Sequence, residues 1–154
     1  MGCTETARAW MRILSAGGVG DAAWRRLAGR MTPERIATML ESERGRERLF
    51  RILGRRVGPP DDAAVAADER LLAGDRYSAI AIGEPGYPPI LAETVDPPPL
   101  LYMAGDPAVA ARPAVCIVGS RAASRRGRLT ARALAADLSA RGVAVVSGLA
   151  RCLL

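Results

Sequence analysis

The sequence contains no lysine and no histidine, so all 22 of its basic residues are arginine. The absence of histidine excludes a histidine-based catalytic triad, a histidine general base and a His-ligated zinc site. The three cysteines, Cys3, Cys116 and Cys152, are too few and too scattered for a disulfide framework or a zinc ribbon. We therefore expect no metal site and no bound cofactor.

Long hydrophobic runs are also absent, because arginine, proline or glycine interrupts the apolar stretches. We expect no segment to span a membrane. Glu5, Arg8 and Arg12 interrupt the N-terminus, which leaves no apolar core for a signal peptide. Hydrophobic residues make up 49% of the chain and charged residues 25%, a composition typical of a folded protein and not of a disordered one. The expected location is the cytoplasm.

The net charge of +6 is unevenly distributed along the chain. Residues 1–60 carry a net charge of +6, residues 61–111 carry −7 and residues 112–154 carry +7. Two basic segments therefore flank an acidic connector, which favours local sites for an anion such as a phosphate backbone. Arginine-rich faces that are merely solvated are the alternative, and composition alone does not decide between the two.

The N-terminal part of the sequence predicts a bundle of short helices over residues 1–58. Thr32 is of the residue type that caps a helix, and a proline follows it in the first turn. Apolar spacing places Leu14 on the buried stripe of the first helix and Phe50 on that of the fourth. We expect an acidic linker with one more helix over residues 59–75. The helices are expected at 5–15, at 21–30, from 33 onward, at 42–56 and at 62–73.

Strand-like segments begin at about residue 76, and we assign residues 76–154 to a second domain. Apolar residues at 77–82 and 100–103 predict two strands. Residues 83–89 are expected to be irregular, and the three prolines at 97–99 to force an extended segment. Helices and strands together predict an α/β fold class.

A parallel βαβ unit is predicted at the C-terminal end of the sequence. Residues 114–118 and 143–146 are continuous apolar runs, typical of strands that are buried on both faces of a sheet. Cys116 is therefore expected in the core. A helix over residues 125–140 connects the two strands, with Leu134 directed toward the sheet. Strand, helix and strand in this order form a right-handed crossover.

Polar residues follow both predicted strand ends, and in open parallel sheets ligands bind beyond the carboxyl ends of the strands. After the first strand, Gly119 allows an anion to approach the backbone closely, Ser120 offers a hydroxyl group and Arg121 a forked guanidinium. Ser124 is a predicted helix cap, which directs the amides and the positive end of the helix toward the same place. The stretch 147–150 follows the second strand, at the same edge of the sheet.

Three arginines, Arg125, Arg128 and Arg132, extend this site along one side of the helix, as a polymeric anion would require. A solvated face is the alternative. Glycines occur in this stretch only at Gly119 and Gly127, so the dinucleotide fingerprint G-x-G-x-x-G is absent. A chain without lysine also has no P-loop. These absences argue against a hydride-transfer enzyme.

The second domain contains five separated motifs: Tyr87-Pro88 with Leu91, Asp96-Pro97-Pro98, Leu101-Tyr102 with Gly105, Ile117-Val118-Gly119-Ser120-Arg121 with Ser124 and Gly127, and Val146-Ser147-Gly148-Leu149-Ala150. In this order and spacing they resemble the DNA-processing protein A family (DprA, also called Smf). The resemblance covers about residues 76–150 and implies an incomplete Rossmann-like parallel core. More loosely, the N-terminal helices are similar to the small SAM-like or helix-hairpin-helix-like domain that many members carry.

The resemblance implies a single-stranded DNA-binding protein with no catalytic activity. Members of the family protect incoming DNA during natural transformation, form homodimers and help to load the recombinase RecA. Arg121 matches the arginine that contacts the phosphate backbone, and its neighbours match other positions of the same pocket. The predicted DNA-binding residues are Gly119, Ser120, Arg121, Ser124, Arg125, Ser147 and Gly148.

The sequence departs from the family after the Ser-Gly-Leu-Ala motif. Members continue with Arg or Gly, then with Gly-Ile-Asp and shortly afterwards with a histidine, whereas residues 151–154 are Arg-Cys-Leu-Leu. Arg126 also replaces the aromatic residue that is usual before Gly127. We therefore expect a fragment truncated after this motif, with apolar strand edges left exposed.

Two alternatives stay open. A nucleotide-processing enzyme of the phosphoribohydrolase type has a related Rossmann-like core, although its Pro-Gly-Gly-x-Gly-Thr loop is absent from this sequence. Gly18, Val19 and Gly20 resemble a helix-hairpin-helix turn, whose amides can hold a DNA phosphate; a turn that serves only packing is the other interpretation. Tyr87 and Tyr102 are expected to pack and not to stack on bases.

Overall fold

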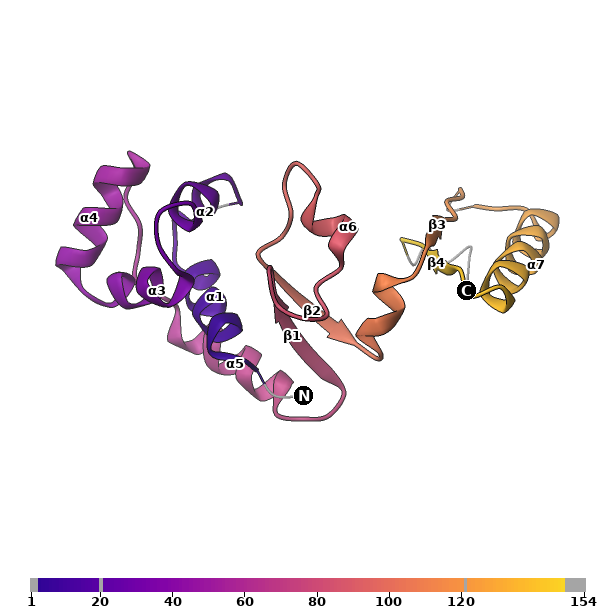
Figure 1. The fold of residues 1–154 in the computed structure, drawn as a ribbon, viewed down its shortest axis with the longest axis horizontal. Helices are drawn as coiled ribbons and strands as arrows, with labels where there is room; N and C mark the ends of the chain where they lie inside the picture. The colour runs from indigo at the N-terminus through magenta and orange to yellow at the C-terminus, as the bar shows by residue number, and fades with distance from the viewer. Residues whose placement is uncertain (1–2, 20, 121, 149–154) are drawn as a thin grey trace. The chain divides into compact units, whose positions relative to one another are not determined.

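The chain folds into two units, Met1–Gly105 and Asp106–Leu154, in the computed structural model (Figure 1). The structure describes residues 3–19, 21–120 and 122–148. Helices and a two-stranded antiparallel sheet form the first unit, and a strand–helix–strand arrangement forms the second. The mixture of helix and sheet agrees with the predicted α/β class, whereas the SAM-like and Rossmann-like assignments stay predictions.

Five helices precede the first strand, and side-chain oxygens cap the N-terminal ends of four of them. The Thr4 hydroxyl accepts a hydrogen bond from the Ala7 amide, and Thr32, Ser42 and Asp61 cap the later helices in the same way. These caps satisfy amides that a helix start otherwise leaves unpaired. Every helix lies within its predicted range. The bounds are α1 Glu5–Ser15, α2 Asp21–Ala28, α3 Pro33–Glu41, α4 Glu43–Leu53 and α5 Asp62–Leu72.

The core of the first unit is centred on two tryptophans. The rings of Trp10 and Trp24 meet edge to face, with their centroids 5.2 Å apart. Two predictions about this core are wrong: Leu14 is 37% exposed and Phe50 is 47% exposed. Both lie beside the buried stripe of their helix and not on it, because short helices bury only a narrow face. The large side chains that are fully buried are Trp10, Met11, Ile13, Leu27, Ile36, Leu40 and Leu49.

Two glycines in this unit occupy positions where a side chain would collide with backbone. A Cβ atom at Gly45 would lie 2.0 Å from the carbonyl oxygen of Met39, so α3 and α4 approach each other closely at this point. Gly18 has φ +86° and its Cβ would lie 2.4 Å from the carbonyl oxygen of Arg56. Packing therefore explains the glycine at position 18. DNA contact by this turn stays a prediction, and Gly20 lies outside the described residues.

The antiparallel sheet consists of β1 (Tyr77–Ala81) and β2 (Leu100–Ala104), with the short helix α6 (Pro89–Ala92) in the stretch between them. The sequence predicted irregular structure over residues 83–89, and α6 begins at the last of these residues. β1 contacts both α1 and α5. The sheet therefore packs in the same unit as the helices, and the two units divide at Gly105, whereas the sequence placed a domain boundary near residue 76. The change from helical to strand-like pattern, which set that boundary, does not report which segments pack together.

Both tyrosines that occur in the family motifs make hydrogen bonds within the first unit. The buried Tyr87 donates from its hydroxyl group to the carbonyl oxygen of Pro98, at 2.6 Å. Tyr102 donates to Oδ2 of Asp68, at 2.5 Å, and burial together with this carboxylate raises the pKa of the phenol. The packing role expected for Tyr87 is thus confirmed.

The second unit contains a short 3-10 helix, η1 (Pro107–Ala111), and then β3 (Ala114–Cys116), α7 (Arg125–Ala140) and β4 (Ala144–Val146). β3 and β4 are parallel neighbours, with Cys116 opposite Val146, which confirms the predicted parallel strand–helix–strand order. The strands are shorter than expected.

The burial predicted for this second unit is wrong. All three residues of β3, Cys116 included, are exposed, and Val118 beyond its end is 81% exposed. Leu134 of α7 is 49% exposed. Among the described residues two short strands face a single helix, and that helix cannot cover both faces of a sheet.

Candidate nucleic-acid interface

The predicted site residues on either side of α7 meet at one edge of the parallel pair. The Ile117 amide donates to the carbonyl oxygen of Val146, at 2.9 Å, and extends the pairing by one residue beyond β3. Gly119 and Ser120 therefore follow one strand end, while Ser147 and Gly148 follow the neighbouring strand end. The structure thus brings both loops to the carboxyl edge, as the sequence predicted.

Two serines shape the first loop. The Ser124 hydroxyl accepts a hydrogen bond from the Gly127 amide, at 3.1 Å, and caps α7 as predicted. The Ser120 hydroxyl accepts from the Ala122 amide, at 3.2 Å. In each case an oxygen lone pair is used, and the O–H donor can still turn toward an anionic oxygen.

The first turn of α7 is strongly basic. It contains Arg125, Arg126 and Arg128 and no acidic residue, whereas each of α1, α3, α4 and α5 has an acid in its first turn. Cations near the positive end of a helix cost about 0.3–1 kcal/mol each at exposed sites. Among the described residues Arg125 and Arg126 form neither an ion pair nor a hydrogen bond. A bound anion would offset this repulsion.

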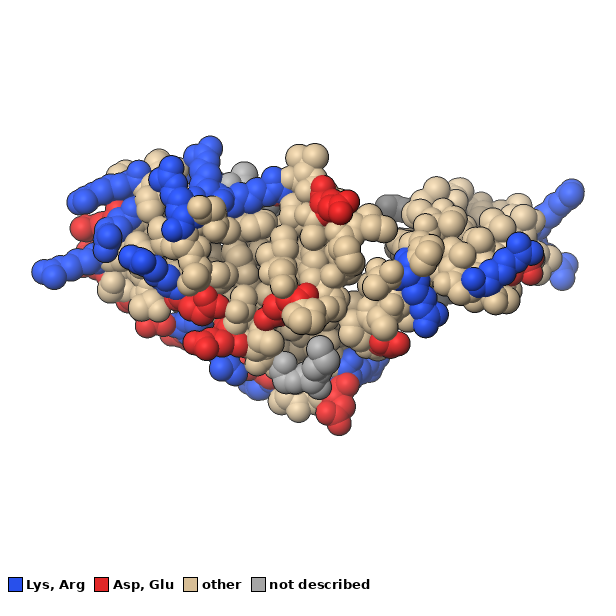
Figure 2. Space-filling view, viewed as in Figure 1, with Lys and Arg blue, Asp and Glu red and all other residues tan. Residues whose placement is uncertain are grey.

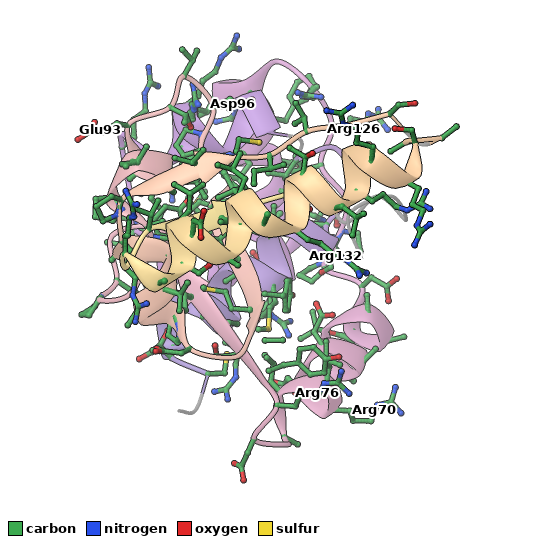
Figure 3. The ribbon with its side chains drawn as sticks, turned by 90° about the vertical axis from the view of Figure 1, so that its right-hand side faces the viewer. Arg70, Arg76, Glu93, Asp96, Arg126 and Arg132 are labelled. Carbon is green, nitrogen blue, oxygen red and sulfur yellow. The ribbon has the colours of Figure 1, made fainter. Side chains whose placement is uncertain are left out.

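Arg128 has a second role that the sequence did not reveal. Its Nη1 atom donates to the carbonyl oxygen of Ala123, at 2.7 Å, and so ties the loop to the helix. Arg126 projects from a different side of α7 than Arg132 (Figure 3). The arginines of the first two turns therefore surround the amino end of the helix and do not form a single row.

A hollow of about 270 Å³ lies between α7 and the strand ends. Its polar lining comes from Arg132 and Ser147, which belong to the predicted stripe and the predicted second loop. Its apolar lining comes from Ile117, Ala131, Ala135 and Val145. A guanidinium and a hydroxyl group against an apolar wall can hold a phosphate with part of its sugar.

Residues 78–153 match the family model described as DNA recombination-mediator protein A. The chain belongs to this family through that segment. The match starts within β1, includes β3, α7 and β4, and contains every residue of the predicted DNA-binding site. It confirms the resemblance to DprA and assigns the chain a role in DNA processing and recombination. No curated protein matches the chain.

In this DprA-family chain, the structure leaves three of the predicted DNA contacts untested: Arg121, Gly119 and Gly148. Arg121, the residue matched to the phosphate-contacting arginine, lies outside the described residues. Gly119 and Gly148 have no positive φ, and a Cβ atom at either would meet nothing within 4 Å. Packing within the described chain therefore does not require glycine at these positions, and the close approach of a ligand stays a prediction for both.

Other kinds of site find no support in the part of the structure that is described. No group of three or more histidine, cysteine, aspartate or glutamate residues could hold a metal ion there. In the same residues, no helix is both long enough and apolar enough to cross a membrane.

Proposed function

We propose that this DprA-family chain binds single-stranded DNA at the amino end of α7 and has no catalytic activity of its own. The interface consists of the loop after β3, the first turns of α7 and the loop after β4. The remaining properties implied by the family belong to the same proposal: protection of incoming DNA in natural transformation, help in loading RecA, homodimerisation and a cytoplasmic location.

The observation that carries the proposal is the first turn of α7, where three arginines stand at the positive end of a helix without an acid to offset them. This arrangement reduces the stability of the free protein, and the other capped helices of the chain avoid it. A ligand that brings several negative charges would turn the unfavourable repulsion into attraction. A phosphate backbone is such a ligand.

The extent of the basic surface supports a polymer. Arg125, Arg128 and Arg132 lie on one side of the helix, and the first and last are seven steps of 1.5 Å apart, which is about 10 Å along the axis. A single phosphate at the cap would contact only the first of them. The hydroxyl groups of Ser120 and Ser124 would donate to the phosphate nearest the cap, and Arg132 would contact a phosphate that enters the hollow beside Ser147.

The test is the binding of a fluorescent single-stranded oligonucleotide, measured by anisotropy over a series of salt concentrations. The variants are Arg121→Ala and, as a matched control, Arg141→Ala, which removes the same charge at the C-cap of α7. Arg121→Ala is expected to weaken binding at every salt concentration and to reduce the slope of log K against log salt by about 0.7. Arg141→Ala is expected to leave the slope unchanged.

Equal binding by the parent and Arg121→Ala would contradict the proposed site. If neither protein binds, a thermal melt of the same samples distinguishes two cases. A cooperative melt without binding refutes the proposed function, whereas a chain that is already unfolded has to be stabilised before the salt series is repeated.

A further inference from the structure

A second basic surface lies in the first unit, on α4 and the turn that follows it. Over residues 43–56 the chain has six arginines and two acids, Glu43 and Glu47. In the space-filling view, basic side chains gather over the part of the first unit that contains α4 and α2 (Figure 2). This surface is not part of the segment matched to the family.

The arginines of α4 form no ion pair with a described acidic residue, in contrast to Arg8, Arg12 and Arg25 of the same unit. Arg8 pairs with Glu69 at 3.0 Å, and Arg25 pairs with Asp96 at 2.7 Å. Arg46 donates to the carbonyl oxygen of Leu40, at 2.7 Å. The rest of this group are exposed and form no ion pair or hydrogen bond with any residue that the structure describes; they are Arg44, Arg48, Arg51, Arg55 and Arg56. These five residues are named the α4 arginine surface below.

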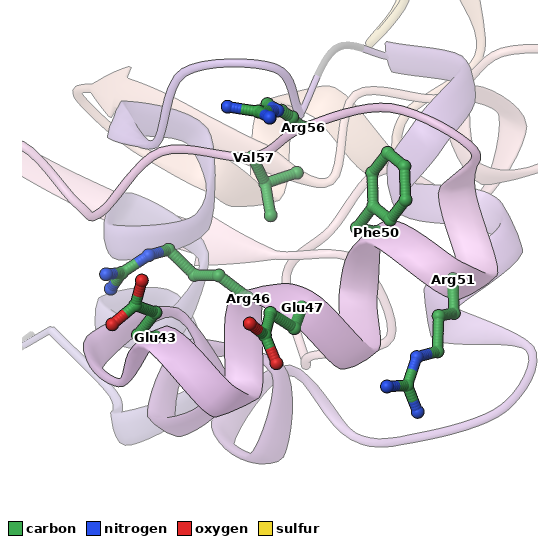
Figure 4. Close-up of a pocket in the computed structure, with 7 residues that line it drawn as sticks. All are labelled: Glu43, Arg46, Glu47, Phe50, Arg51, Arg56 and Val57. Carbon is green, nitrogen blue, oxygen red and sulfur yellow. The ribbon is translucent and has the colours of Figure 1, made fainter.

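Phe50 is the one phenylalanine of the chain, and it stands at the edge of the α4 arginine surface. Its ring lines an open groove of about 600 Å³. The other lining residues are three arginines, two acids and one apolar residue, namely Arg46, Arg51, Arg56, Glu43, Glu47 and Val57. In the close-up view Phe50 points toward the segment that carries Arg56 and Val57, while Arg51 points away from that segment (Figure 4). The buried side of α4 is formed by Gly45, Leu49 and Leu53, so the fold of the helix does not use the ring.

We propose that the α4 arginine surface and Phe50 bind a single-stranded nucleic acid. Phosphates would contact the unpaired guanidinium groups, and an unpaired base would stack on the ring of Phe50. Bases of a duplex are stacked on each other and cannot reach such a ring. A membrane surface would require an apolar face several residues wide, and Phe50 is the only large apolar side chain in the groove besides the buried Val57.

This site is independent of the one at α7, because the two surfaces lie in different units of the chain. One can therefore exist without the other. If both exist, loss of either site would lower the affinity without abolishing binding.

The test uses the full chain and a labelled oligothymidine of about 30 nucleotides, longer than the 4–16 nucleotides that one site of this kind covers. The variants are Phe50→Leu, which removes the ring and keeps an apolar side chain, and the double variant Arg48→Gln/Arg51→Gln. Arg70→Gln on α5 is the control for loss of a positive charge outside the α4 arginine surface. Each variant is also made in the Arg121→Ala background, so that the two sites are measured separately.

Phe50→Leu is expected to weaken binding about tenfold in both backgrounds. The double variant is expected to reduce the slope of log K against log salt by about 1.4, and Arg70→Gln to change neither quantity. Oligouridine of the same length shows whether the surface takes DNA, RNA or both, and each of these results agrees with the proposal. Melting temperatures of the variants should match the parent, because Phe50, Arg48 and Arg51 are all exposed.

The proposal is overturned if Phe50→Leu binds as tightly as the parent in both backgrounds. It is also overturned if a duplex of the same length binds as well as the single strand, since the surface would then attract any polyanion or an acidic protein. Loss of binding by Arg121→Ala alone would support only the α7 site. Loss by the α4 variants alone would support only the site proposed here.

Discussion

The two units of the chain use their apolar residues in opposite ways. The first unit buries a continuous set of side chains around Trp10 and Trp24. In the second unit, none of the residues described between 106 and 148 is buried, and its order comes from backbone hydrogen bonds and caps. The proposed DNA site therefore lies on the part of the chain that has the least core to stabilise it. A ligand that binds there should also stabilise that unit.

The largest expected effect is the difference in stability lost when one apolar side chain is removed from each unit. Trp10→Ala should lower the free energy of unfolding of the first unit by about 3–5 kcal/mol, because it removes a fully buried ring and leaves a cavity. Leu134→Ala on α7 should cost about 1 kcal/mol or less, since half of the side chain is already in solvent. Chemical denaturation followed by far-UV circular dichroism measures both changes.

Tryptophan fluorescence sharpens this comparison. Both tryptophans lie in the first unit, so their emission reports on that unit alone. The fluorescence transition should shift strongly in Trp10→Ala, where Trp24 still reports, and should stay in place in Leu134→Ala. A cost for Leu134→Ala close to that of Trp10→Ala would contradict the 49% exposure of this side chain and would show that α7 packs tightly in solution.

A smaller effect concerns the acid stability of the first unit. The Thr6 hydroxyl donates to Oε1 of Glu34, at 2.7 Å, and this bond, more than any other contact, lowers the pKa of the carboxyl group. A carboxyl group with a lowered pKa in the folded state stabilises the fold above its unfolded pKa of about 4.3, and this stabilisation is lost as the pH falls through the folded value. Thr6→Val should therefore reduce stability at neutral pH and have little effect below the folded pKa.

Thr38→Val is the matched control for this pH dependence. Its hydroxyl group donates to the backbone carbonyl of Glu34, at 2.9 Å, and not to the carboxylate. Thr38→Val should change the free energy of unfolding, followed by tryptophan fluorescence, by the same amount at every pH between 3 and 7. If the change in the free energy of unfolding caused by Thr6→Val is also the same at every pH, the Thr6 hydroxyl does not determine the pKa of Glu34.

Local sequence signals predicted the elements of both units well. The caps at Thr32 and Ser124 and the parallel pairing of 114–118 with 143–146 follow from residue type and spacing, which act over a few residues. The two short helices, α6 and η1, were missed because proline-rich stretches carry no periodic signal.

Burial was predicted less well than the elements themselves. Phe50 and Leu134 both fit an apolar helical spacing, yet each is about half exposed. Spacing reports which side of a helix is apolar, and the presence of a neighbouring element to cover that side depends on the tertiary fold. For the same reason the sequence found the arginines of α7 but not the bond from Arg128 to the carbonyl oxygen of Ala123.

The central claim is that the first turn of α7 is arranged for an anion and not for the stability of the helix. Its most direct test is charge reversal in the variant Arg125→Glu, with thermal stability and affinity for single-stranded DNA measured on the same sample. We expect stability and DNA affinity to change in opposite directions. Stability should rise by about 0.3–1 kcal/mol, because an acid is favoured at the positive helix end, while DNA affinity should fall. A variant that is less stable and binds DNA as tightly as the parent would contradict the account.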